Sequence, residues 1–276
     1  MSGGAEGDAR ESGRLGPPAL LRVASFNVRT GFGRDGRHCW PLRAGACAAA
    51  IAGLDADLVG LQEVRLFQEW GLARRLRGYA GAGAGRDDGR WRGERCTVVF
   101  RSSRLRLDEW TVRWLSDSPW APGSRSWGNP IARIVTLCRF SDRRTGDRFG
   151  FADAHWDGAS AASRLRSAEA LLDWLDPSLP WLVAGDLNAT AGDPAVAKLV
   201  AGGLSDTLAG LGERGPQAAT HHQWDGSTDG TRIDYVLAGA RWDVLGARID
   251  HARPGGRLPS DHWPVVADVV LRPAPA

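Results

Sequence analysis

The sequence predicts an α/β domain in which helices cover two β-sheets. Along the 276-residue chain, short apolar runs of strand length alternate with stretches of helix length. A hydrophobic content of 43% and 13 tryptophans indicate a substantial core. Several predicted strands end in a polar residue, and in α/β sheets the carboxyl ends of strands are where sites gather. No internal repeat or strong linker divides residues 20–271, so we expect one domain there.

Both ends of the chain are expected to lie outside this domain. Residues 1–19 are rich in glycine and charge and poor in large apolar side chains, which favours disorder. They lack the apolar stretch of a signal peptide, and no run approaches the length of a membrane-spanning helix. The short segment 272–276 ends the fold. These features predict a monomer located in the cytoplasm.

Charge and cysteine content argue for no particular partner. The net charge of +3 comes from 35 basic and 32 acidic residues and is too small to indicate nucleic acid by itself. Nearly all the basic residues are arginine, which binds phosphate and carboxylate in bidentate fashion, although a GC-rich coding sequence gives the same bias. The four cysteines form no CxxC pair and no zinc spacing, so we expect reduced thiols.

The opening of the chain predicts strand, helix, strand, helix. The first strand carries Asn27 near its end, and Gln62 and Glu63 follow the second strand directly. A polar residue thus stands at the carboxyl end of each strand. The predicted strands are 20–28 and 57–61, and the predicted helices are 43–54 and 66–76.

Residues 78–130 predict less regular structure with long loops rich in arginine and tryptophan. Such loops contact phosphates and stack on a base or a ring, but a solvated loop with its tryptophans packed on the core has the same composition. Both interpretations stay open. Strands are expected at 79–85, 96–101 and 104–114.

The second half of the chain repeats the pattern of strands that end in polar groups. A charged turn with a glycine, at 142–147, joins two strands as a hairpin. Asp193 and Pro194 open a short helix, with a capping residue followed by proline. Strands are expected at 131–140, 148–154, 180–184, 232–237, 243–251 and 263–270, an amphipathic helix at 163–175, and mostly loop at 202–230.

The run Gly185-Asp186-Leu187-Asn188 ends the strand at 180–184. On an extended backbone Asp186 and Asn188 point to the same face. Gly185 removes a side chain where another group comes close. An aspartate and an asparagine on one face suit a divalent cation, an activated water and a phosphoryl oxygen. The same residue types form an Asx turn at the end of a strand, so the run alone leaves both interpretations open.

Polar groups at six strand ends form the candidate site. Each has an ordinary alternative: Glu63 could cap a helix, His155 could be a hydrogen-bonded core histidine, and Asp234 could pair with Arg232. One shared site explains all six more simply than six separate coincidences do. The groups are Asn27, Glu63, His155, Asp186 with Asn188, Asp234, and Asp261 with His262.

The motifs around these residues resemble those of the endonuclease/exonuclease/phosphatase superfamily. Each motif is short, but their order and spacing over residues 22–270 fit the family. The resemblance implies a four-layer α-β-β-α sandwich of two packed, mostly antiparallel sheets, as in DNase I, with the site at one rim. It also implies cleavage of phosphate esters that depends on Mg²⁺ or Mn²⁺. The motifs are Ser25-Phe26-Asn27, Leu61-Gln62-Glu63-Val64, Ala154-His155-Trp156-Asp157, Gly185-Asp186-Leu187-Asn188, Arg232-Ile233-Asp234-Tyr235 and Ser260-Asp261-His262.

The resemblance also implies which residues hold the metal and the substrate. Glu63 is the expected principal metal ligand, Asn27 lies beside the metal and the phosphate, and Asp261 serves a second metal position. One carboxylate with weak ligands suffices for Mg²⁺, which keeps several waters. The candidate substrate contacts are Arg92, Arg95, Arg133 and Trp156.

The remaining matched residues imply a hydrolytic mechanism. Asp186 is expected to orient or deprotonate the attacking water, and Asn188 to hold a phosphoryl oxygen. His262 is expected to donate to that oxygen in the transition state, with Asp234 favouring its protonated form. His155 is expected to contact the phosphate.

Two departures from the family pattern narrow the function. Ala154 stands where the family commonly has threonine, and Val64-Arg65 replaces the Thr-Lys of the DNA-repair branch. Residues 37–65 look most like uncharacterised bacterial members. The arginine- and tryptophan-rich loop at 86–127 favours a phosphodiesterase acting on nucleic acid or on a smaller nucleotide or lipid head-group diester, since arginine can hold phosphate and tryptophan can stack on a base. A small-molecule phosphomonoesterase and a catalytically silent binding protein on the same fold stay as alternatives.

Overall fold

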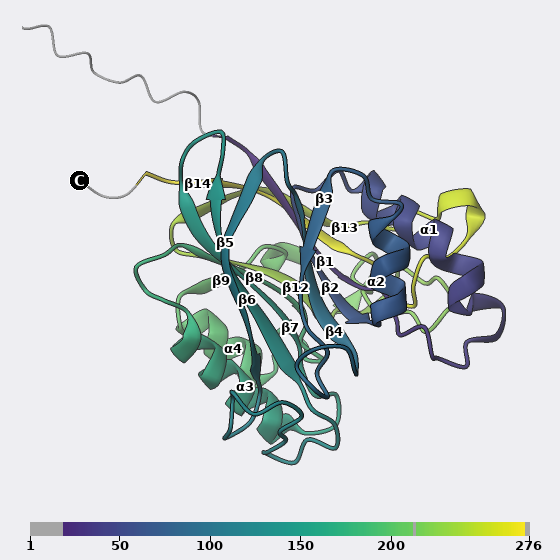
Figure 1. Ribbon diagram of the computed structural model, residues 1–276, viewed down its shortest axis with the longest axis horizontal. Coiled ribbons are helices and arrows are strands. Elements are labelled where there is room, and N and C mark those ends of the chain that lie inside the picture. Colours follow the sequence, from purple (N-terminus) through teal and green to yellow (C-terminus); the bar gives the residue numbers. More distant parts are fainter. Residues whose placement is uncertain (1–18, 212–213, 274–276) are drawn as a thin grey trace, which may run out of the picture.

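The computed structural model describes residues 19–211 and 214–273. Two six-stranded sheets pack face to face, and helices cover their outer faces (Figure 1). This confirms the predicted four-layer sandwich. The predicted disorder of the amino-terminal tail falls on residues 1–18, and part of the carboxyl-terminal tail falls on 274–276, all outside the described residues. In the part of the chain that is described, no helix combines the length and apolar character that crossing a bilayer requires.

The first sheet has the strand order β13-β14-β1-β2-β4-β3. Its one parallel pair is β1 with β2, and the other neighbours are antiparallel. Helix α1 (Trp40–Gly53) connects the parallel pair, and α2 (Leu66–Ala73) follows β2. The strands are β1 (Leu21–Asn27), β2 (Leu58–Val64), β3 (Tyr79–Ala82), β4 (Arg95–Arg101), β13 (Trp242–Ile249) and β14 (Val265–Leu271).

The second sheet has the order β5-β6-β7-β8-β12-β9 and the same plan. Its one parallel pair, β7 with β8, is connected by α3 (Ala161–Trp174), and α4 (Pro194–Ala201) packs beside α3. The strands are β5 (Leu105–Trp114), β6 (Ile134–Asp142), β7 (Arg148–His155), β8 (Trp181–Asp186), β9 (Leu204–Asp206) and β12 (Asp234–Gly239). A small ribbon of β10 (Arg214–Gly215) and β11 (Gly230–Thr231) and short 3-10 turns complete the chain.

Most predicted elements are present, and their ends shift for local reasons. Helix α1 begins at Trp40 rather than residue 43, because Pro41 suits the first helical turn. Helix α4 begins after Asp193 as predicted, and the Asp193 side chain accepts a hydrogen bond from the N–H of Ala195. Strand β2 continues through Gln62 and Glu63 to Val64, with a register shift in its pairing to β4.

The alternation of side chains along the inner strands leads from the core to one rim. In β7, Phe149 and Phe151 pack between the sheets, and Asp153 and His155 follow on the same face. The same change from apolar to polar positions occurs toward the ends of β1 and β8, the strands that end at this rim. The corresponding series are Leu21, Val23, Ser25 and Asn27 in β1, and Leu182, Ala184 and Asp186 in β8.

Gly185 lies where two neighbouring strands come close together. A Cβ atom at this position would lie 2.5 Å from the carbonyl oxygen of Ala154 on β7. The parallel pairing of β7 and β8 therefore requires glycine one residue before Asp186.

Gly185→Ala is expected to lower the free energy of unfolding by about 1–3 kcal/mol, because the new methyl group collides with backbone. Gly45→Ala is the control. Gly45 lies inside α1, and no described atom lies within 4 Å of a Cβ built there, so alanine should raise stability by up to about 1 kcal/mol. Urea unfolding measures both values, and equal effects of the two substitutions would contradict the close approach.

Candidate active site

A chain of contacts at the rim joins strand ends from both sheets. The Nδ2 of Asn27 on β1 donates to Glu63 Oε1 at 3.1 Å and to Asp186 Oδ2 at 2.9 Å. The Nε2 atoms of His155 and His262 lie 3.6 Å and 3.9 Å from that same Asp186 oxygen. The structure thus brings together five residues that the sequence predicted as one site. Asp234 and Asp261 adjoin them through His262.

Two of these strands end in the same kind of turn. Asn27 Oδ1 accepts the N–H of Arg29, and Asp186 Oδ1 accepts the N–H of Asn188. The third residue of each turn, Arg29 or Asn188, has a positive φ of 57° or 48°. The Asx-turn interpretation of the Gly185–Asn188 run is therefore confirmed. Asp186 uses one carboxylate oxygen for an Asx turn and presents the other at the rim.

Asn188 does not follow the strand alternation expected from the sequence. Strand β8 ends at Asp186, and the left-handed backbone of Asn188 rotates its side chain out of the strand pattern. Its Nδ2 donates to the carbonyl oxygen of Trp156 at 3.1 Å. The expectation that Asp186 and Asn188 share an extended face is wrong, because the turn begins between them.

Glu63 is held at the rim by an irregularity in β2. The register of β2 against β4 shifts between Leu61 and Val64, and Glu63 has a φ of 61°. The bulge turns its carboxylate toward β1, where Oε2 accepts the N–H of Thr30 at 2.9 Å. Glu63 is not the cap of α2. That role falls to Gln68, whose Oε1 accepts the N–H of Arg65.

Arg29 is a rim residue that the sequence analysis missed. Its guanidinium lies 4.0 Å from Glu63 Oε2 and 3.6 Å from Asp261 Oδ2, and it also binds Asp35. Glu63 and Asp261 therefore both lie beside the guanidinium of Arg29. The available signal was the position of Arg29, two residues after Asn27 at the end of a predicted strand.

His262 forms a buried ion pair with Asp234. Its Nδ1 lies 2.9 Å from Asp234 Oδ2, while the neighbouring Arg232 pairs with Asp206 instead. Burial alone would lower the pKa of His262. The carboxylates of Asp234, Asp186 and Asp261 outweigh burial and raise this pKa to about 10. At neutral pH the ring is therefore protonated, and Nε2–H is available as a donor at the rim.

Asp186 is buried beside a second buried carboxylate, Asp234. Burial, and then the charge of Asp234, raise the pKa of Asp186 to about 7, against the opposing effects of His262 and Asn27. A carboxylate with a pKa near the working pH is suited to accept a proton from water. The rim thus holds a carboxyl group and an imidazole that both have raised pKa values.

His155 is neutral and lies beside an arginine. Burial, followed by the positive charge of Arg133, lowers the pKa of His155 well below its ordinary value. The neutral ring accepts a hydrogen bond at Nε2 from Arg133 Nη1, at 3.0 Å. Arg133 Nε lies 3.6 Å from a carboxylate oxygen of Asp157. The predicted substrate contact Arg133 therefore lies next to the predicted phosphate contact His155.

The other three predicted substrate contacts differ in how they lie relative to the rim cluster. Trp156 is fully buried in the core between the second sheet and its helices, because it points to the opposite face of the sheet from His155. Its expected role as a substrate contact is corrected accordingly. Arg95 is buried and pairs with Glu69 of α2, and it lines a small pocket together with Arg133 and His155. Arg92 is exposed in the loop between β3 and β4.

Two residues before β12 also belong to the surroundings of the site. The His221 ring lies over the His262 ring, with centroids 4.5 Å apart, and the two residues form an isolated β-bridge. Thr220 Oγ1 accepts the N–H groups of Ile233 and Asp234 and so holds the start of β12. The only signal in the sequence was a pair of adjacent histidines in a chain with 6 histidines in all.

The donor atoms at the rim fit a divalent cation. Glu63, Asn27 and Asp261 offer oxygen ligands, which hard cations prefer. Among the described residues, one group that could hold an ion consists of His221, Asp261 and His262. A second group consists of Asp186, Asp234 and His262. In this group, His262 Nδ1 and Asp234 Oδ2 are already engaged in a hydrogen bond with each other.

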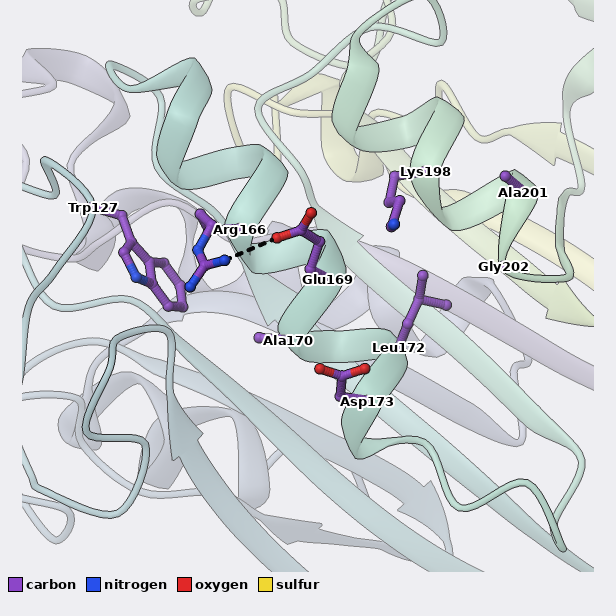
Figure 2. A pocket seen from close by; sticks show the side chains of 9 residues that line it. All are labelled: Trp127, Arg166, Glu169, Ala170, Leu172, Asp173, Lys198, Ala201 and Gly202. Atoms are coloured by element: carbon purple, nitrogen blue, oxygen red, sulfur yellow. Dashed lines mark hydrogen bonds and ion pairs between the residues drawn. The ribbon is translucent and has the colours of Figure 1, made fainter.

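A cavity of about 520 Å³ lies elsewhere, on the outer helices (Figure 2). Arg166 of α3 lies over the Trp127 ring at 5.6 Å and pairs with Glu169 at 3.3 Å. Lys198 of α4 reaches the same cavity from the other helix (Figure 2). None of its lining residues belongs to the rim cluster.

Comparison with known proteins identifies the family. The family model described as Endonuclease/Exonuclease/phosphatase family matches residues 24–262. The chain belongs to this family. It is accordingly a phosphoester hydrolase of the endonuclease/exonuclease/phosphatase type, and the resemblance seen in the motifs is confirmed. No curated protein matches the chain.

Solved structures of this family share the whole fold. A family protein from Bacteroides thetaiotaomicron is 28% identical, with a TM-score of 0.86 over 93% of this chain and 100% of that one. The mannosyl-6-phosphatase of Bacteroides thetaiotaomicron is 28% identical, with a TM-score of 0.83 over 91% and 100%. The human Nocturnin catalytic domain, at 20% identity, has a TM-score of 0.70 over 92% and 94%. The last likeness concerns the fold alone.

Asp234→Asn is expected to lower the pKa of His262 from about 10 toward or below its ordinary value of about 6.5, because burial then acts against a weaker set of carboxylates. NMR titration of the His262 ring measures this change. Asp206→Asn, which breaks the Asp206–Arg232 pair, is the control. A His262 that still titrates near 10 in Asp234→Asn would exclude this ion pair as the cause.

The same ion pair predicts a pH dependence of stability. Because the pKa of His262 is raised in the folded protein, its stabilisation is fully present below about pH 6.5 and is lost as the pH rises through about 10. Unfolding free energies measured across this range should converge for the wild type and Asp234→Asn at the alkaline end.

Proposed function

We propose that this hydrolase is a Mg²⁺- or Mn²⁺-dependent phosphodiesterase that uses an activated water. The observation that carries the proposal is the meeting of three kinds of group at one rim. Oxygen donors for a cation, a carboxylate suited to accept a proton, and a protonated imidazole lie within one connected set of contacts. Hydrolysis of an anionic phosphate ester needs all three.

The metal would be held by Glu63 and Asn27, with Asp261 beside them. A bound divalent cation supplies neutralisation of the phosphate and a lowered pKa of bound water. Asn27 has a second task, because its amide also donates to Asp186 Oδ2. It therefore links the metal side of the rim with the proton acceptor.

Proton transfer is assigned to the two groups with shifted pKa values. Asp186 Oδ2 takes the proton of the attacking water, and Asn27 fixes the direction of this oxygen. His262 donates Nε2–H to a phosphoryl oxygen as charge develops there. Asp234 keeps the ring protonated and oriented.

His155 and Arg133 are assigned to binding of the phosphate. The neutral imidazole uses Nε2 as acceptor for Arg133, so the arginine is fixed with its positive charge at the rim. The side-chain amide of Asn188 donates one hydrogen to the backbone carbonyl oxygen of Trp156. Its second hydrogen is left to donate to a phosphoryl oxygen.

The balance of charge favours a diester over a monoester. Each cation of the rim already has a carboxylate neighbour, and Glu63 would offset one of the two charges of a divalent metal, so about one positive charge remains for the substrate. That charge suits a diester, which carries one negative charge, better than a monoester, which carries up to two. The neighbouring pairs are Arg29 with Asp261, His262 with Asp234, and Arg133 with Asp157.

The arginine- and tryptophan-rich loops leave the sheets at this same rim. Strand β4 begins at Arg95, whose partner on β2 is Val64, the residue after Glu63. Strand β5 ends at Trp114, which pairs with Ile134 of β6, and Ile134 in turn pairs with His155 of β7. The loops before β4 and after β5 carry Trp91 and Trp120, which are 65% and 64% exposed. Exposed rings near the site offer stacking surfaces for a group beyond the phosphate.

A phosphomonoesterase is the second candidate. It is favoured by the likeness, at 28% identity and over nearly the whole chain, to a protein named as a mannosyl-6-phosphatase. A monoesterase would use the same rim with a different arrangement of loops, because substrate choice lies in the loops rather than in the fold.

Hydrolysis of bis-p-nitrophenyl phosphate and of p-nitrophenyl phosphate separates the two candidates. We expect diester cleavage with Mg²⁺ or Mn²⁺, none with EDTA, and a loss of at least about 100-fold in Asp186→Ala. Asp173→Ala, at the distant helix cavity, is the control. Cleavage of the monoester alone would support the second candidate. Absence of turnover with metal binding retained would support a silent binding protein.

Glu63→Gln is expected to weaken metal binding and to lower turnover by about 10²-fold or more, because the amide keeps the shape of the side chain but removes its charge. Calorimetric titration with Mn²⁺ and the hydrolysis assay measure the two effects. The matched control is Glu69→Gln, which changes a carboxylate of α2 that pairs with Arg95. Unchanged metal affinity in Glu63→Gln would sink the assignment of this ligand.

A further inference from the structure

Directly beneath the rim lies a layer of polar side chains that the assigned mechanism does not use. Its members are fully buried and face the space between the two sheets, where the neighbouring positions are apolar. Burying polar groups in such a place costs free energy unless they are hydrogen-bonded. We call this set the inter-sheet polar layer; it consists of Ser25, Gln62, Thr136 and Asp153.

The central contact of this layer crosses from one sheet to the other. Gln62 Nε2, from β2 of the first sheet, donates to Asp153 Oδ1, from β7 of the second sheet, at 2.6 Å. The same Gln62 nitrogen lies 3.2 Å from Ser25 Oγ on β1. At the side of this contact, Thr136 Oγ1 donates to the carbonyl oxygen of Cys96. Hydrogen bonds therefore span the sheets at the level below the rim.

Each partner in the central contact is next to a residue of the site. Gln62 directly precedes Glu63, and Asp153 precedes His155 by two residues on the same face of β7. Ser25 precedes Asn27 in the same way on β1. Because the bulge in β2 begins after Leu61, the anchoring of Gln62 also fixes where the irregular backbone of Glu63 starts.

The backbone leaves room for the Asp153 carboxyl. A Cβ atom at Gly60 would lie 2.7 Å from Asp153 Oδ1 and 3.0 Å from Ala184 Cβ. The sheets thus approach as closely as a glycine allows at this point. Any larger residue at 60 would push the carboxyl away or separate the sheets.

The Asp153 carboxyl group is fully buried, and its contacts are hydrogen bonds from Gln62 and from backbone groups. Burial raises the pKa of its carboxyl well above the ordinary value, and hydrogen bonds from Gln62 and nearby backbone groups do not offset this. Among the described residues, Asp153 Oδ2 and Gln62 Oε1 have no hydrogen-bond partner. A proton on the carboxyl supplies the donor that such an amide oxygen lacks, so an uncharged side chain suits the position.

We propose that the Asp153–Gln62 contact is a positioning bridge that sets the spacing of the two sheets under the active site. It holds Asn27 and Glu63 of the first sheet at a fixed distance from His155 and Asp186 of the second. Asp153 is thus a positioning residue, which acts through its neighbours and touches neither metal nor substrate. The effect on turnover that we expect rests on the proposed function. The effect on the spacing of the two sheets does not.

Three variants test the bridge. Asp153→Asn keeps a neutral hydrogen-bonding group of the same shape, and we expect kcat/KM within about threefold of the wild type. Asp153→Leu fills the space without the bridge, and we expect a loss of about 10- to 100-fold in kcat and in Mn²⁺ affinity, as for other outer-shell partners. Leu182→Ala, also between the sheets but four residues before Asp186, lowers stability without touching the bridge.

The readouts separate positioning from general stability. Melting temperature, Mn²⁺ binding by calorimetry and turnover are measured for each variant. Crystal structures of the wild type and Asp153→Leu give the separation of Glu63 and His155, which we expect to change. The proposal is overturned if Asp153→Leu keeps metal affinity, turnover and this separation. It is equally overturned if Asp153→Asn fails as Asp153→Leu does, or if Leu182→Ala loses the same turnover.

Failure of the proposed function gives a different pattern. If the wild type cleaves neither ester, the phosphodiesterase proposal fails. The bridge is then judged by Mn²⁺ affinity and by the Glu63–His155 separation alone. A changed separation in Asp153→Leu, restored in Asp153→Asn, supports the bridge even without turnover, and an unchanged one refutes it.

Discussion

Face-to-face packing of two sheets is the constraint on which the rest of the structure depends. Every second side chain of an inner strand must enter a space shared with the opposite sheet, and phenylalanine, leucine and valine fill most of it. A polar residue on that face is tolerated cheaply only where the space opens to water. The site therefore lies at a rim, and two parallel pairs, β1 with β2 and β7 with β8, direct their carboxyl ends to it.

At this rim, environment gives different tasks to chemically similar groups. Asp234 lies against the His262 ring as its partner, whereas burial and the nearby charge of Asp234 raise the pKa of Asp186 to about 7. The two histidines divide in the same way: three carboxylates keep His262 charged, and burial beside Arg133 keeps His155 neutral. Separation of pKa values between like groups is how a site obtains an acid and a base from a small set of side chains.

Strand alternation predicted two sheets whose strands end in polar groups, and the family resemblance of the motifs implied the four-layer sandwich in which these ends meet at one rim. They failed where the backbone leaves the strand pattern. The positive φ values of Arg29, Glu63 and Asn188 belong to turns and a bulge, which a period of two does not describe. The approach of His221 to His262 joins two residues that lie outside the strands and 41 positions apart along the chain, and no local pattern encodes it. The prediction of Trp156 as a substrate contact did not take strand alternation into account. Adjacent residues of an extended chain face opposite ways, so Trp156 and His155 cannot both line the rim. The cytoplasmic location and the monomeric state stay predictions.

The chain contains a single lysine, Lys198. It is exposed on α4, at the cavity between the outer helices. The rim, on the far side of the second sheet from those helices, takes its positive charge from guanidinium and imidazolium groups. Amine-selective chemistry at an ε-amino group is therefore directed to a single point remote from the phosphate-binding groups. A fluorophore, a surface linker or a cross-linker attached there would report on the enzyme, or orient it, while the face that meets the substrate stays unmodified.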